Sequence, residues 1–139
     1  MNAIQQSAHT MAEQIALAAM VFQQQRTGHK PKSVSVMFSG DTLVVTLHGA
    51  LSPAEQAMAQ SPVGAAKVQE FHRQLFLNAS DTLQQEIKRI TGVEVNEESA
   101  EVDPRCGPLV TVFPSGTMVL VFQLSGNVPS GSFIGENET

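Results

Sequence analysis

The sequence predicts an α+β domain in which helices cover one face of an antiparallel sheet of four or five strands. Three observations predict this class. Two long stretches repeat apolar residues every three or four positions. Paired stretches of alternating apolar and polar residues are joined by turn residues. Along the chain the elements follow the order helix, hairpin, short helix, long helix, hairpin.

Residues 3–26 are predicted to form the first helix. Arg26 lies in its last turn, Gly28 follows where a left-handed residue is favoured, and Pro31 prevents continuation. The helix either packs on its own sheet or is shared with a second subunit, since three heptads are the lower limit for a coiled coil. One stripe carries its apolar residues, Ile4, Ala8, Met11, Ile15, Ala18 and Phe22.

A β-hairpin is predicted next, with strands at residues 33–39 and 42–49. The sequence Ser39-Gly40-Asp41 between them tolerates the positive φ angles of a tight turn. Each strand alternates, so each has one buried face, and we expect helices on one side of the sheet only.

Two helices are predicted to follow the hairpin. Ser52 can cap the first, Pro53 suits its first position, and Glu55 completes a capping box. The sequence Ser61-Pro62 repeats this start and opens a longer helix, which Gly92 ends. We expect one continuous helix, with a break at Ser80-Asp81 as the alternative. Its predicted apolar face consists of Val68, Phe71, Leu75, Ala79, Leu83, Ile87 and Ile90.

Residues 93–102 are predicted to begin as a strand and then to become an acidic, solvated edge. Strands are predicted at 109–113 and 117–124, although the stretch Asp103–Gly116 is either an extra strand or a loop. The last strand is apolar on both faces, so it is central or lies under a partner. We expect one domain over residues 1–124 and a mobile tail over 125–139, in which Phe133 and Ile134 dock on the body or on a partner.

Composition limits the possible partners. The chain has 139 residues and a net charge of −5, with only 15% charged residues. This balance argues against nucleic acid and against an anionic membrane surface. We see no signal peptide and no apolar run long enough to insert into a bilayer, so we expect a cytoplasmic protein without direct membrane insertion.

The residues that could carry chemistry form no recognisable constellation. Cys106 is the single cysteine, and none of the four histidines stands in a motif relation to it, so its reactivity stays open. The histidines are also dispersed, and no phosphate-binding glycine loop is present. We therefore predict no catalytic residue, no metal site and no cofactor. A satisfied or solvent-facing role is expected for His48 and His72.

One stretch of the sequence resembles a known family. The pattern Leu-Ser-Pro-x-Glu after a Leu-x-Gly strand end is the most specific part of it. The family is the MpsC-like family of small bacterial proteins, and the resemblance covers roughly residues 3–124. The matching positions are Gly28, Pro31, the stretch from Asp41 to Gly49, the stretch Leu51-Ser52-Pro53-Ala54-Glu55, Gly64, Val68, Arg73, Leu83, Ile87 and Thr91-Gly92-Val93.

The resemblance implies a soluble cytosolic protein that associates with membrane-transporter components of a sodium-linked, membrane-potential-generating system, which is linked to uptake of inorganic carbon. It implies no catalytic residue. Most motif positions already have structural explanations as helix caps and stops. Arg73 is the exception, because a motif arginine inside a helix suggests either a salt bridge or a ligand or partner contact.

Three hypotheses of function follow. The first is a non-enzymatic accessory or regulatory subunit that acts through protein contacts, in a homodimer or with a membrane-transporter partner. The second is a small anion- or ligand-sensing domain that uses Arg73 or the basic cluster of Arg26, His29, Lys30 and Lys32. The third is a thiol-dependent enzyme centred on Cys106.

Overall fold

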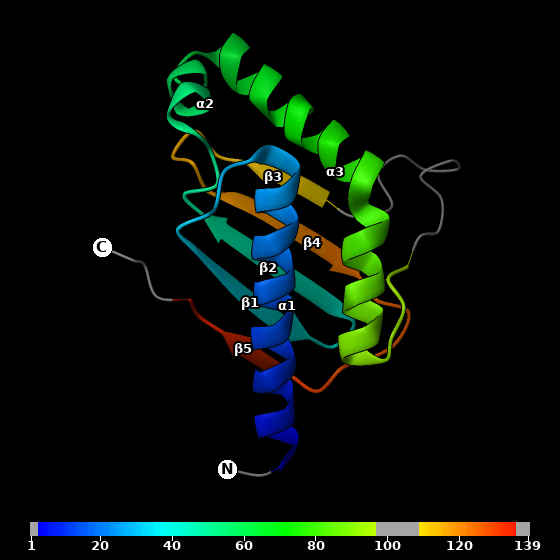
Figure 1. Ribbon diagram of the computed structural model, residues 1–139. Helices are drawn as coiled ribbons and strands as arrows, with labels where there is room; N and C mark the ends of the chain where they lie inside the picture. Colours follow the sequence, from blue (N-terminus) through cyan, green and yellow to red (C-terminus); the bar gives the residue numbers. More distant parts are fainter. Residues whose placement is uncertain (1–2, 97–108, 136–139) are drawn as a thin grey trace.

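The structure is a computed structural model that describes residues 3–96 and 109–135 (Figure 1). Three helices are present: α1 (Ala3–Thr27), α2 (Pro53–Met58) and α3 (Pro62–Thr91). The strands are β1 (Ser33–Ser39), β2 (Thr42–His48), β3 (Leu109–Val112), β4 (Met118–Gln123) and β5 (Gly131–Phe133). They form one antiparallel sheet in the order β3-β4-β2-β1-β5, and α1 and α3 lie on one of its faces. The predicted α+β class is confirmed.

Helix α1 packs on its own sheet. It contacts β1, β5 and α3, and the stop that we predicted is present, because Gly28 adopts a φ of +77° directly after the last helical residue. The residues on its buried side are Ala12, Ile15, Ala16, Ala19 and Phe22. The core-facing stripe therefore includes Ala12, Ala16 and Ala19, which lie beside the predicted stripe.

Helix α3 is continuous through Ser80-Asp81, as predicted, but its buried face differs from the predicted one in its first half. Phe71 is exposed, whereas His72 and Phe76 are buried. The Phe76 ring lies 5.9 Å from the Phe22 ring and 5.7 Å from the Phe122 ring, measured between centroids. A spacing of three or four residues fits two adjacent stripes of a helix, and these aromatic contacts decide which stripe faces the core.

The segment after Leu124, where we expected a mobile tail, contributes a strand to the sheet. Val128 is buried, and β5 extends the sheet beside β1. On α1, His9 contacts this strand, since its Nδ1 lies 2.9 Å from the Ser132 carbonyl oxygen. Phe133 packs against the core, so one of the two predicted docking residues meets the body of the protein.

The described part of the acidic segment forms a short backbone contact with the end of β4 in place of the predicted strand, with hydrogen bonds from the Asn96 amide to the Gln123 carbonyl oxygen and from the Ser125 amide to the Glu94 carbonyl oxygen. Val95 forms an isolated bridge with Leu124. The rest of the acidic stretch and Cys106 lie outside the described residues. The alternative over Asp103–Gly116 is settled for its second half, because residues 109–112 form β3 and pair with β4. Strand β4 is therefore interior, as its apolar sequence predicted.

A close backbone approach joins α2 to α3. Gly64 lies in the first turn of α3, and a Cβ added there would lie 1.8 Å from the Met58 carbonyl oxygen at the end of α2. This distance is far below van der Waals contact, so the two helices can meet in this way only because residue 64 has no side chain. Beneath them Leu51, Ala59 and Val68 form a second small core.

We expect Gly64→Ala to lower the free energy of unfolding by about 1–3 kcal/mol, because the backbone must shift to admit the methyl group. At an unhindered helix position the same change stabilises by up to about 1 kcal/mol. Urea unfolding of the two proteins measures the difference. A gain in stability in the variant would contradict the close approach.

Candidate functional site

The carboxylate of Glu55 organises one end of the molecule. This end carries α2 and the first half of α3, and we call it the α2–α3 end. The Ser52 amide and hydroxyl donate hydrogen bonds to Glu55 Oε1, at 3.1 and 2.9 Å. In return the Glu55 amide donates to the Ser52 hydroxyl at 3.3 Å. With Pro53 at the first position, this is the capping box that the sequence predicted, and it fixes where α2 begins.

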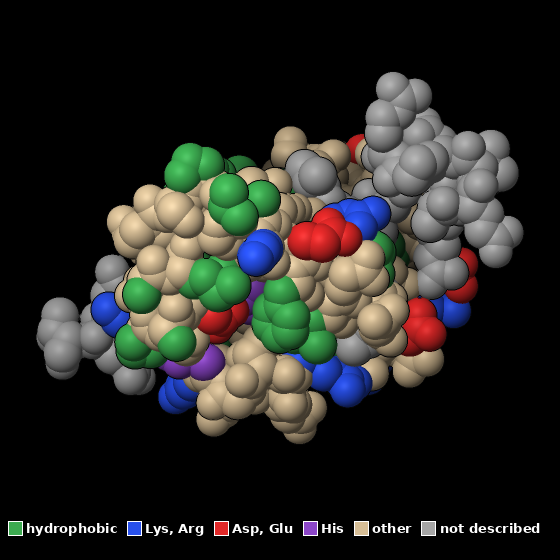
Figure 2. Space-filling model, turned by 90° about the horizontal axis from the view of Figure 1, so that it is seen from above, with side chains coloured by type: hydrophobic (Ala, Val, Ile, Leu, Met, Phe, Trp, Pro, Cys, Tyr) green, Lys and Arg blue, Asp and Glu red, His purple; other side chains and the backbone are tan. Residues whose placement is uncertain are grey.

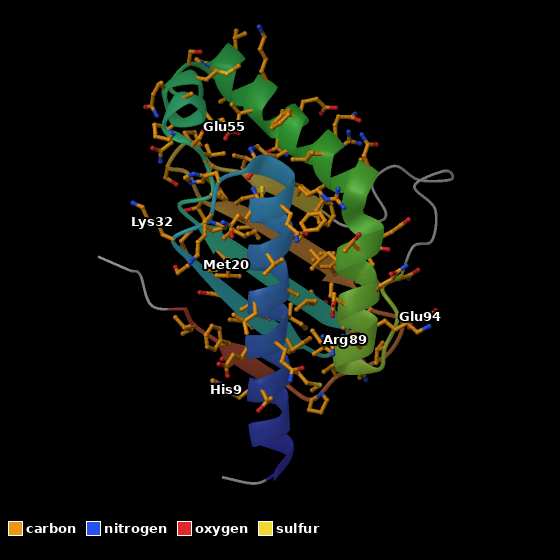
Figure 3. The ribbon with its side chains drawn as sticks, viewed as in Figure 1. His9, Met20, Lys32, Glu55, Arg89 and Glu94 are labelled. Atoms are coloured by element: carbon orange, nitrogen blue, oxygen red, sulfur yellow. The ribbon has the colours of Figure 1, made fainter. Side chains whose placement is uncertain are left out.

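The second oxygen of the same carboxylate joins α2 to α3. Glu55 Oε2 lies 2.5 Å from His72 Nε2. The His72 side chain is only 1% exposed, and the ring of Phe71 meets it edge-on at a centroid distance of 5.2 Å. Figure 3 places Glu55 beside α2, far from Arg89 and Glu94 at the other end of α3. The pair therefore joins the short helix to the first half of the long one.

Opposing effects act on the pKa of Glu55. Burial alone raises it, because a carboxylate loses solvation there. Hydrogen bonds from the Ser52 amide, from His72 and from the Ser52 hydroxyl, together with the charge of His72, outweigh burial and hold this pKa below its ordinary value. Glu55 is thus ionised at neutral pH, and its network is complete there.

Further side chains attach this end to the sheet. Gln69 of α3 donates to the Val110 carbonyl oxygen and accepts from the Val112 amide, both at 2.6 Å. These bonds satisfy the outer side of edge strand β3, which would otherwise present unpaired groups. Gln56 of α2 donates to the Ser115 carbonyl oxygen in the β3–β4 turn at 3.4 Å. This end of the molecule is therefore bonded to two backbone groups of β3 and to one in the β3–β4 turn.

An apolar surface covers the outside of this fixed end. We call Met58, Val63 and Phe71 the α2–α3 surface; their exposed fractions are 46%, 68% and 54%. Val63 and Phe71 are eight residues apart on α3, so they share a side of that helix. Figure 2, viewed from above this end, shows hydrophobic side chains gathered here, with a few charged ones between them.

The structure places Arg73 on α3, Arg26 in the last turn of α1, and Lys30 and Lys32 between α1 and β1. Arg73 forms an exposed ion pair with Glu70 at 3.2 Å. We considered two roles for Arg73, a salt bridge and a ligand or partner contact, and this pair is the first of them. Arg26 lies over the Phe22 ring, 5.7 Å from its centroid, and Lys30 is exposed. The stem of Lys32 passes Gly49 so closely that a Cβ there would lie 2.7 Å from Lys32 Cγ.

Other motif positions serve the fold. His29 Nε2 contacts the Gly49 carbonyl oxygen at 3.0 Å, and the buried Pro31 leads the chain into β1. The Asp41 carbonyl oxygen accepts from the Leu124 amide at 2.7 Å. Gly92 ends α3 with a φ of +76°. His48 lies half-buried on the sheet face opposite Leu47, as expected, with Nε2 3.4 Å from the Ser35 hydroxyl.

Two depressions lie elsewhere on the described surface. A polar one at the C-terminal end of α3 includes Asp81, Lys88 and Glu94, and the last two form an exposed ion pair at 2.7 Å. The other runs between α1 and α3 beside Leu17 and Val21. Within the described ranges, no three metal-ligating side chains come together, and no helix is long and apolar enough to cross a bilayer.

The pairing of Glu55 with His72 is the feature that sequence reasoning missed. His72 was expected to be satisfied or solvent-facing, and it is satisfied, but its partner lies 17 positions earlier. Only half of a signal was present in the sequence: a capping-box glutamate has one oxygen left over, but the spacing of α3 does not show that His72 faces it.

We expect Glu55→Gln to destabilise the fold by about 1–3 kcal/mol at neutral pH, because bonds to an ionised acceptor are lost. Since the pKa of Glu55 is lowered by folding, its contribution is complete above the ordinary carboxyl pKa of about 4.3 and disappears as the pH falls through the folded-state pKa. Urea unfolding at a series of pH values measures the difference between the two proteins.

As a control, Glu70→Gln removes an exposed pair and should change stability by less than about 0.5 kcal/mol. The difference between wild type and Glu55→Gln should shrink toward low pH. A difference that is constant with pH, or absent at neutral pH, would contradict the network described above.

Comparison with known proteins agrees with the resemblance in the sequence. No curated protein and no solved structure matches this chain. A family model described as "Na+-translocating membrane potential-generating system (MpsC)" matches residues 7–114. This range contains the whole α2–α3 end and well over half of the 139 residues. The chain therefore belongs to the MpsC family.

Proposed function

We propose that this protein is a non-enzymatic accessory subunit of the sodium-translocating system for which its family is named, and that it acts by binding a protein component of that system. The α2–α3 surface is the docking face in this proposal. We place the protein in the cytoplasm, and we take inorganic carbon as the cargo whose uptake the system supports.

The observation that carries the proposal is the exposure of three large apolar side chains on a fixed support. Met58, Val63 and Phe71 face solvent, while the backbone beneath them is held by the Glu55–His72 pair and by the Gly64 contact. A fixed surface loses little conformational entropy on binding, and aromatic residues such as Phe71 are enriched at the centre of interfaces.

The charges around this surface favour a protein over a lipid headgroup. Lys67, Glu70 and Arg73 lie on the same part of α3, and the last two form a pair. Charges of both signs around an apolar centre are typical of the polar rim of a protein interface. An anionic bilayer would instead favour a surface of positive charge alone.

The acid–base groups at this end support a role without catalysis. Both oxygens of Glu55 already hold hydrogen bonds, and His72 Nε2 is engaged by Glu55 beneath the surface. A general base needs a nitrogen or oxygen within reach of a substrate proton. The pair is better suited to fix the docking face.

The test is complementation in cells that lack this chain. We expect such cells to lose sodium-dependent membrane potential, measured with a voltage-sensitive dye, and sodium-dependent bicarbonate uptake. Wild type should restore both. Val63→Ser and Phe71→Ser should restore neither at wild-type expression levels, because losing a central apolar contact weakens binding by roughly tenfold or more.

Leu17→Ser is the matched control. The exposed fraction of Leu17, 60%, is close to that of Val63, 68%. Leu17 lies on α1, beside the depression between α1 and α3 and outside the α2–α3 surface. This variant should restore both signals. Full restoration by Val63→Ser and Phe71→Ser would reject the docking face, and unchanged signals in the deletion strain would reject the proposed function itself.

A further inference from the structure

The face of the sheet opposite α1 and α3 is covered by no described helix (Figure 1). Side chains alternate along each strand, and those on this face lie between the buried positions. We call this set the open face. Its members on the three longest strands are Ser33, Ser35, Met37 and Ser39 of β1, Thr42, Val44, Thr46 and His48 of β2, and Val119, Val121 and Gln123 of β4. Ser33, at the start of β1, is the one buried member.

The open face has an apolar centre. Strand register places Met37 beside Val44, and Val44 beside Val121, in one row across three strands. Met37 is 57% exposed, while Val44 and Val121 are half-buried. The next row contains Ser35, Thr46 and Val119. Small hydroxyl residues thus border a band of apolar side chains that meets solvent.

The open face also lacks charge. On β1, β2 and β4 none of its members is Lys, Arg, Asp or Glu. Solvated sheet faces are usually polar, and charged side chains protect exposed strands from association. A charged partner would leave its own charges unpaired here, whereas a surface of the same kind would not. The hydroxyls of Ser35 and Thr46 both donate and accept, so this face can meet a copy of itself.

We propose that the open face is a self-association surface, and that its occupant is the open face of a second copy of this chain. The inference goes beyond the proposed function, because it uses residues on a different side of the molecule. Two twisted sheets pack face to face about 10 Å apart with their strands nearly aligned. A twofold axis along β2 then brings Val44 opposite Val44 of the second copy, and Met37 opposite Val121 of the second copy.

The available area fits a reversible dimer. Five strands spaced about 4.8 Å apart, with a mean length between five and six residues and a rise of about 3.3 Å per residue, give a face of roughly 24 by 18 Å. Two copies would together cover on the order of 1,000 Å², which is near the lower limit for specific interfaces. The dimer should therefore form and dissociate with protein concentration.

Sedimentation velocity over roughly two decades of concentration tests this inference. Wild type should shift from monomer to dimer as the concentration rises. Met37→Lys and Val44→Lys should each raise the dissociation constant by about tenfold or more, because each dimer gains two buried positive charges. Thermal unfolding of both variants shows whether the monomer remains folded, and Met37 is the safer position because it is the more exposed.

Met58→Lys is the matched control, since it adds the same charge at another exposed methionine, on the α2–α3 surface. It should leave the dissociation constant within about twofold of wild type. A wild type that remains monomeric at every concentration would overturn the inference. So would a folded Met37→Lys protein that dimerises as wild type does. Neither result affects the complementation test, which uses Val63 and Phe71.

Discussion

The carboxylate of Glu55 is the constraint on which the α2–α3 end depends. Helix α2 has six residues, and a helix of this length is unstable by itself in water. One oxygen of Glu55 closes the capping box with Ser52, and the other bonds His72 of the next helix. A single ionised side chain therefore both starts the short helix and attaches it. Loss of that charge would weaken both the capping box with Ser52 and the bond to His72.

This attachment explains how apolar side chains can remain exposed without collapsing into the core. The Gly64 contact and the Gln69 bonds to β3 hold the backbone, so Val63 and Phe71 stay on the outside. The open face of the sheet is a second, separate surface. In a dimer with its axis along β2, the two α2–α3 surfaces would lie at the same end of the assembly, so that both could meet one multisubunit partner.

Most of the fold was predictable because local signals agreed with it. Caps and stops such as Ser52 and Gly92 gave helix bounds within a residue or two, alternation located β1 and β2, and apolar runs located β3 and β4. Strand β5 was not predicted, because a three-residue strand rich in Gly and Ser carries no such pattern. The side of α3 that is buried was not predictable from spacing, since the contacts that select Phe76 over Phe71 come from α1 and β4. The Glu55–His72 pair was missed for the same reason: it joins two helices whose relative placement only the folded chain defines.

Hydrogen exchange of the α2 amides tests most directly whether the Glu55–His72 pair fixes the α2–α3 surface, which we propose as the docking face. In wild type the amides of Gln56 and Ala59, bonded to the carbonyl oxygens of Ser52 and Glu55, should be protected. In His72→Gln they should exchange much faster, while the amides of β2 and the second half of α3 keep their protection. Equal protection of α2 in both proteins would contradict this account.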